Sequence, residues 1–423
     1  MWTQGHPARY VSWMSSRPEV RFLDRTTPPH IVTLVLMAGV AAMNMAAFLP
    51  SLPRMTTHFN TDYSVMQLSV SLYLAATAIL QLVIGPLSDR FGRRPVVLVC
   101  LGIFIFATLG CLFAPSIEIF LAFRMLQGAV AVGLVLSRAI VRDMVPQREA
   151  ASMIGYVTMG MALVPMIAPM IGGALDEFFG WQATFVFLAA SGLGVLLLCY
   201  FDQGETASGD GKSFRDQIRE YPELLASRRF WGYVFAAAFA SGTFFAFLGG
   251  APLVASDVYG LSAFWAGIGF GAPAIGYAIG NYLSGRFSIQ YGINAMVQAG
   301  TVITTLGMIL ALAISLAGYG SAIKFFALCT FVGVGNGLVM PNASAGMLSV
   351  RPHLAGTASG LGSAILIGGG AALSAFAGVA LSWGGGDIPL LAIMAISATL
   401  GYISVRFVIA REKRLEETTP LPD

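Results

Sequence analysis

The chain has 423 residues, of which 56% are hydrophobic and 11% are charged. Soluble domains carry about 25% charged residues, so this composition excludes an ordinary soluble enzyme. Twelve membrane helices of about 20 residues each would need roughly 240 apolar positions, which is close to the number available. The net charge of +3 does not indicate a nucleic-acid partner, because the basic residues are sorted by membrane side and not gathered on one face.

Charge-free stretches define the membrane spans in chain order. Eleven of them are long and apolar, and a twelfth is interrupted only by Arg124 and Arg138. The predicted spans cover residues 31–53, 63–88, 95–117, 119–140, 150–175, 178–201, 230–256, 258–285, 287–323, 325–350, 354–386 and 388–405. The fold class expected is therefore an all-α integral membrane protein with 12 transmembrane helices.

The loops between these spans differ in charge. With a cytoplasmic N terminus, 20 lysines and arginines lie on the cytoplasmic side and only Arg54 and Lys324 on the other. Positive residues accumulate on the cytoplasmic side of membrane proteins. This asymmetry predicts that both termini are cytoplasmic.

A polar segment at 202–229 separates two halves with related sequences. LSDRF at 87–91 returns as LSGRF at 283–287, and FLPSLP at 48–53 is echoed by FLGGAP at 247–252. Similar offsets in corresponding positions indicate a duplicated six-helix unit with transport at the interface between the halves. The expected division is a tail at 1–29, a bundle at 30–201, a linker at 202–229, a bundle at 230–408 and a tail at 409–423.

The most specific motif is GPLSDRFGRR at 85–94, after the second span. Its glycines allow a tight turn, its arginines favour the anionic cytoplasmic leaflet, and Asp89 can pair with an arginine or a helix N-terminus. The alternative is an exposed turn whose arginines only set topology, which leaves Asp89 without a purpose. The corresponding position in the second half is Gly285, so we expect an asymmetric gate.

Together with RMLQG at 124–128, RAIVRD at 138–143 and APMIGG at 168–173, this motif resembles the major facilitator superfamily. Within it, the chain is similar to drug:proton antiporters, above all the Bcr/CflA-type exporters of bicyclomycin and chloramphenicol or florfenicol. The resemblance implies a monomer in the bacterial inner membrane, driven by the proton gradient without a bound cofactor. It also implies a cytoplasmic gate formed by Gly85, Asp89, Arg90, Gly92, Arg93, Arg142 and Asp143.

Arg124 lies about 9 Å inside the fourth span, where an unpaired charge facing lipid is costly. Helical spacing puts Arg138 and Arg142 at nearly its azimuth, which predicts one inward-facing basic stripe. An ion pair is the alternative, but no acid lies at comparable depth. The expected substrate pathway comprises Asn44, Tyr73, Thr77, Gln81, Arg124, Gln127 and Arg138, with Tyr277, Asn281, Phe244, Phe245 and Phe247 as second-half candidates. For each, interhelical hydrogen bonding or simple packing is an equal alternative.

The fifth span is rich in helix-weakening residues, namely Gly155, Pro169, Gly172 and Gly173. Such residues allow close helix contact in lipid. We expect this helix to pack on the eleventh, whose GGGAA at 368–372 mirrors it. The antiporter motif of the family has Gly-Pro at Ala168-Pro169, so the match is partial, and packing without any antiport role is equally consistent.

The acid that the resembling family often carries in its first helix is replaced by Ala46. Since no carboxylate is predicted in the membrane core, a cation would be repelled, and neutral or weakly anionic amphiphiles are the expected substrates. Proton coupling would need an acid at the membrane edge, for which Asp143 is the candidate. A facilitator or importer of a small metabolite without proton coupling is the alternative. An enzyme is excluded, because no metal-ligand cluster or phosphate-binding loop is present.

Overall fold

The computed structural model describes residues 20–145, 147–207, 222–351 and 354–418. Every regular element within these ranges is a helix. Eleven helical segments there are long and apolar enough to cross a membrane, and the further long helix α7 (Gln147–Phe179) occupies the position of the predicted fifth span. The predicted all-α membrane architecture is confirmed.

Each half is built from a similar series of helices. The first contains α1 (Ile31–Ala46), α2 (Leu52–His58), α3 (Tyr63–Phe91), α4 (Arg93–Leu112), α5 (Ile117–Leu126), α6 (Val132–Met144), α7 and α8 (Trp181–Asp202). The second contains α10 (Arg228–Leu253), α11 (Ala263–Gly269), α12 (Gly271–Tyr291), α13 (Ile293–Leu316), α14 (Ala322–Val350), α15 (Ala355–Ser382) and α16 (Ile388–Thr418). Short 3₁₀ turns connect α1 to α2 and α5 to α6, so each of these pairs forms one span.

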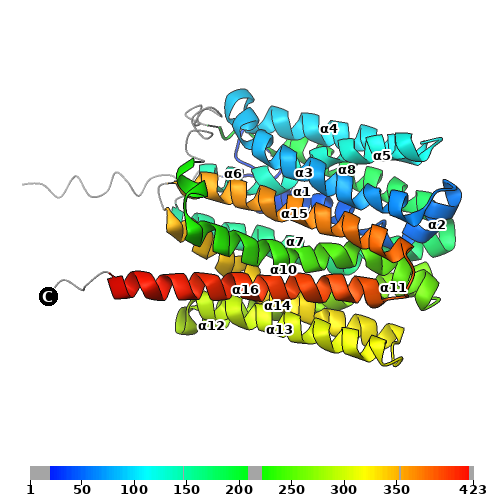
Figure 1. Cartoon of the computed structure of the whole chain (residues 1–423). Coiled ribbons are helices and arrows are strands. Elements are labelled where there is room, and N and C mark those ends of the chain that lie inside the picture. Colours follow the sequence, from blue (N-terminus) through cyan, green and yellow to red (C-terminus); the bar gives the residue numbers. More distant parts are fainter. Residues whose placement is uncertain (1–19, 146, 208–221, 352–353, 419–423) are drawn as a thin grey trace, which may run out of the picture.

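The helices lie side by side, with α3, α4, α5 and α8 of the first half at the top of Figure 1, α12, α13, α14 and α16 of the second half at the bottom, and α7 and α15 between them. The most extensive contacts between the halves are those of α3 with α15 and of α7 with α11 and α12, and α10 also touches α2 and α3. The spans that contain α1 and α10 are the most buried. The interface between the halves is therefore formed by elements from both repeats.

Several helix boundaries differ from those predicted. The GPLSDRFGRR motif is not an extended loop, because α3 continues to Phe91 and α4 begins at Arg93, with only Gly92 between them. Gly92 has φ +93°, and Gly292 before α13 has φ +81°. Glycine adopts this left-handed conformation without steric cost, so each helix pair can turn through a single residue. We call the end of the molecule that carries Gly92, Arg93 and Arg94 the arginine-rich end.

The charged residues near the C terminus also belong to a helix. The charge-free stretch ends near residue 405, but α16 runs on to Thr418. A helix that leaves the bilayer can continue through charged residues, because water solvates their side chains and the backbone bonds remain internal. Charge-free length therefore underestimates a helix at the membrane surface.

Candidate functional site

Arg124 is completely buried inside the first half. Its guanidinium donates to the Asn44 side-chain oxygen at 3.0 Å, the Asn44 carbonyl at 3.0 Å, the Ser69 carbonyl at 3.1 Å and Gln127 Oε1 at 2.5 Å. Hydrogen bonds from a charged donor contribute about 1.5–3 kcal/mol each. Four such bonds explain how an arginine is held at this depth.

Two aromatic rings complete the environment of this arginine. The guanidinium carbon lies 4.0 Å from the centre of the Phe48 ring and 4.5 Å from that of Tyr73. Desolvated cation–π contacts of this kind are worth about 2 kcal/mol. Gln127 in turn donates to the Thr108 hydroxyl at 2.8 Å, which connects the site to α4. Sequence reasoning identified Asn44, Tyr73 and Gln127 as neighbours of Arg124 and missed Phe48 and Thr108.

No carboxylate compensates the charge of Arg124 within the described ranges. The buried carboxylates there are Asp176, Asp202 and Asp387. Asp176 pairs with Arg54 at 3.2 Å, and the other two accept hydrogen bonds from neutral donors. A positive charge in low dielectric repels other cations strongly.

The predicted basic stripe is divided in the structure, because Arg138 interacts electrostatically with Arg142 but differs from Arg124 in its environment. Arg124 is buried, whereas Arg138 is exposed and interacts electrostatically with Tyr277 of the second half. The cause is the 3₁₀ segment Gln127–Ala131 between them. Because a 3₁₀ helix turns 120° per residue instead of 100°, five such residues rotate α6 by about 100° relative to α5.

The remaining pathway candidates have diverse environments. Thr77 is buried and Gln81 is partly exposed on α3, while the Asn281 amide donates to the Tyr277 carbonyl of its own helix at 2.8 Å. Phe244 is partly buried and Phe245 is 8% exposed. The expectation that Phe247 offers ligand surface is wrong, because it is fully buried and packs against the rings of Phe270, Phe325 and Phe326.

At the arginine-rich end, Arg93 connects α3, α4 and α6. Its guanidinium lies 2.5 Å from Asp89 and 3.0 Å from Asp143, and it also donates to the Ser88 hydroxyl at 2.5 Å. Asp89 and Asp143 thus share one arginine. Arg90 and Arg142 are exposed. Gly85 lies within α3, with open space where a Cβ atom would be.

Glu205 is a site residue that sequence reasoning missed. Its carboxylate accepts from the Arg93 backbone N–H at 2.7 Å and from the Arg94 backbone N–H at 3.2 Å. These are unpaired donors at the start of α4, where the helix dipole favours a negative charge. A Cβ atom on Gly92 would lie 2.5 Å from this carboxylate, so a larger residue there would have to displace Glu205. Glu205 lies more than 100 positions after the start of α4 in the sequence, so no local sequence pattern predicts that it caps this helix.

The close contacts of α7 are not those predicted. A Cβ atom on Gly172 would lie 1.7 Å from the Ala47 carbonyl, and one on Gly173 would lie 2.3 Å from the Ala263 carbonyl. A Cβ atom on Gly267 would likewise lie too close to the Pro169 carbonyl oxygen. The partners of α7 therefore include α1, α11 and α12, whereas α15 packs on α3. The surroundings of Gly155 lie outside the described set.

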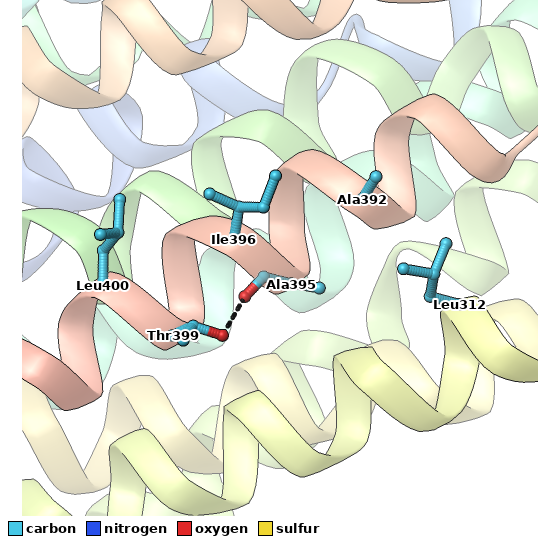
Figure 2. Close-up of a pocket in the computed structure, with 6 residues that line it drawn as sticks. All are labelled: Leu312, Ala392, Ala395, Ile396, Thr399 and Leu400. Atoms are coloured by element: carbon cyan, nitrogen blue, oxygen red, sulfur yellow. Dashed lines mark hydrogen bonds between the residues drawn. The ribbon is translucent and has the colours of Figure 1, made fainter.

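A shallow apolar groove of about 280 Å³ lies away from all these residues. It is formed by α13 and α16 of the second half, and its lining residues include Leu312, Ile396 and Leu400 (Figure 2). Thr399, the polar residue at its edge, donates to the Ala395 carbonyl of its own helix at 2.7 Å. With 61% of Ile396 exposed, this groove is part of the apolar outer surface and not of the interface between the halves.

Comparison with known proteins shows the family. The model of the Major Facilitator Superfamily matches residues 34–375. An uncharacterized MFS-type transporter, YdgK of Bacillus subtilis, is 29% identical over 90% of this chain and 95% of its own length. A chloramphenicol resistance protein of Pseudomonas aeruginosa is 30% identical over 75% of this chain and 76% of its own.

Among solved structures, a bacterial homologue of the human lysosomal transporter Spinster, crystallised in an inward-facing and occupied conformation, shares the fold. Its TM-score is 0.70 at 17% identity, over 93% of this chain and 98% of that one. The resemblance to drug-transporting relatives that the sequence motifs indicate is confirmed. This chain is a membrane transporter of the major facilitator superfamily.

Proposed function

We propose that this transporter exports small drug-like amphiphiles from the bacterial cytoplasm, with neutral or weakly anionic compounds favoured, in exchange for protons. The similarity to a chloramphenicol resistance protein supports drug export. The observation that carries the charge preference is Arg124, which is fully buried among neutral acceptors and aromatic rings. A cation near this group would be repelled in a medium that screens poorly.

In this proposal the arginine-rich end faces the cytoplasm, as the distribution of basic residues favours. Arg138, exposed and facing Tyr277 of the other half, is then a second positive group on the way to the interface. An uncharged molecule with hydrogen-bonding groups avoids this repulsion and can use aromatic and amide surfaces.

The proton would act at the arginine-rich end. Asp89 and Asp143 together with Arg93 carry a formal charge of −1, so protonation of one carboxylate leaves the other paired with the arginine. Asp143 is the coupling acid that we favour, since it belongs to α6, the helix that also carries Arg138. A change in its pairing would alter the contact of α6 with α4.

The test is accumulation of a neutral phenicol in bacteria that lack their own exporters and express this chain. We expect lower accumulation than in cells with an empty vector, and loss of this difference when a protonophore collapses the proton gradient. The Arg124→Ala variant, at matched membrane abundance, is the control for specific transport. Export that survives the protonophore would favour the facilitator alternative, and equal accumulation in all cells would refute drug export.

A further inference from the structure

A glutamine joins the two halves at the end opposite the arginine-rich end. Gln67 of α3 is completely buried, and its amide nitrogen donates to the Ser374 hydroxyl of α15 at 2.7 Å. Ser374 is also completely buried. One turn earlier on α3, the Tyr63 hydroxyl donates to the Gly249 carbonyl of α10 at 2.8 Å. Three helices from both halves therefore meet around one side chain.

The space around Gln67 exists because its neighbours are glycines. A Cβ atom on Gly249 would lie 2.4 Å from the Gln67 amide nitrogen, and one on Gly378 would lie 2.9 Å from its amide oxygen. Real Cβ atoms do not approach other atoms so closely, and the site lies in a packed interior that tolerates little extra volume. We call Tyr63, Gln67, Gly249, Ser374 and Gly378 the Gln67 junction.

Within the described ranges, direct hydrogen bonds between the halves are confined to this end. They are the two above and a long one of 3.5 Å from the Phe264 N–H to Glu177. At the other end, Gly85 of α3 and Gly360 of α15 have no atom within 4 Å of the position that a Cβ atom would take. The two helices are thus in contact at the Gln67 junction, whereas these two glycine positions nearer the arginine-rich end face open space.

The interactions at the Gln67 junction are weak enough for the two halves to separate. The junction contains no ion pair, and the Gln67 amide oxygen has no hydrogen-bond partner although it is buried. Water would satisfy that oxygen if the helices separated, which offsets part of the loss of the Ser374 bond. Shape complementarity and a small number of neutral hydrogen bonds therefore hold the halves together here.

We propose that Gln67 is a latch residue, which holds the two halves together at the end opposite the arginine-rich end. We call this the outer end. The fit of Gln67 between Gly249 and Gly378 sets the equilibrium between the closed and the open outer end. This inference rests on the proposed function in one respect, namely that the transporter alternates between a state open at one end and a state open at the other. Gln67 acts through the position of the helices and does not need to contact the transported molecule.

The test measures the distance between the outer ends of the two halves without any substrate. Spin labels replace the exposed residues Thr57 of α2 and Ser382 of α15, after the partly exposed Cys100 is changed to serine. In the purified full-length protein, Gly378→Ala displaces Gln67 and should raise a longer-distance population several-fold. Gly368→Ala, on the same helix with no atom within 4 Å of the added methyl, should leave the distances as in the parent protein.

A second variant keeps the test decisive if Gly378→Ala does not fold. Gln67→Met preserves side-chain length and removes the bond to Ser374, so it should shift the distances in the same direction by a smaller amount. Parent-like distances in a folded variant of either kind would overturn the latch. Because no drug or proton gradient is present, failure of the export proposal would leave this result interpretable.

Discussion

Arg124 is the residue on which the proposed substrate preference rests. Its guanidinium donates four hydrogen bonds to Asn44, Ser69 and Gln127, and no carboxylate among the described residues neutralises it. Burying a charge in this way is costly unless hydrogen bonds replace its hydration. An arginine held with uncompensated charge is consistent with a functional and not a purely structural role.

Arg124→Lys should lose most transport even though the charge is retained. Lysine has three donors on a flexible stem and cannot span acceptors on three different elements, whereas the planar guanidinium does. We expect at least a tenfold lower export rate, measured as drug efflux at matched protein abundance. Arg124→Gln should lose at least as much. Normal efflux by both variants would show that the arginine has no part in transport.

Asp89→Asn should leave membrane insertion intact and abolish most transport. Asparagine keeps the size of the side chain and can still accept a hydrogen bond from Arg93, but it removes the negative charge and with it the ion pair. The matched change is Gly285→Asp in the second half, where a Cβ atom would meet nothing within 4 Å. That variant should not increase efflux, and unimpaired efflux by Asp89→Asn would contradict a gate role.

Glu205→Gln should destabilise the first half. The neutral amide can accept one backbone hydrogen bond but no longer places a negative charge at the start of α4, an effect worth about 0.3–1 kcal/mol. We expect a lower thermal unfolding midpoint of the detergent-solubilised protein. Arg286→Gln, which removes an exposed charge on α12 away from a helix N-terminus, is the control and should leave the midpoint unchanged. Equal midpoints for the two variants would argue against the cap.

At the scale of elements, the sequence predicted the spans well and their relations less well. Charge-free length identified the membrane helices, because the bilayer penalises charges in the same way at each span. Spacing along an ideal α-helix failed at Arg138, because the 3₁₀ turn at Gln127–Ala131 has no strong sequence signal. The Glu205 cap and the Gln67 junction depend on contacts between distant segments, which one sequence without tertiary information does not specify.

Gly172→Ala should be poorly tolerated. Its Cβ atom would lie 1.7 Å from the Ala47 carbonyl, a backbone atom that cannot move without shifting the first span. Overpacking of this kind costs about 1–3 kcal/mol. We expect reduced yield of monodisperse protein on size-exclusion chromatography. Gly102→Ala on α4, where no atom lies within 4 Å of the new methyl group, should give the parental yield.

At the scale of the whole molecule, the two ends of the interface differ in chemistry. The arginine-rich end is organised by charges within the first half, through Arg93, Asp89 and Asp143. The opposite end is closed between the halves by neutral groups around Gln67. This division suits a carrier in which ionic contacts respond to protons while the separation of the halves requires no buried ion pair to break.

The most direct test of the proposed charge preference uses proteoliposomes with the purified protein and an imposed pH gradient. Two drug-like compounds of matched size are compared, one a neutral amide and the other a quaternary ammonium analogue. We predict gradient-dependent transport of the amide and at least about tenfold slower transport of the cation, since a repulsion of only ~1.4 kcal/mol in the rate-limiting step gives that factor. Efficient transport of the quaternary compound would contradict the role assigned to Arg124.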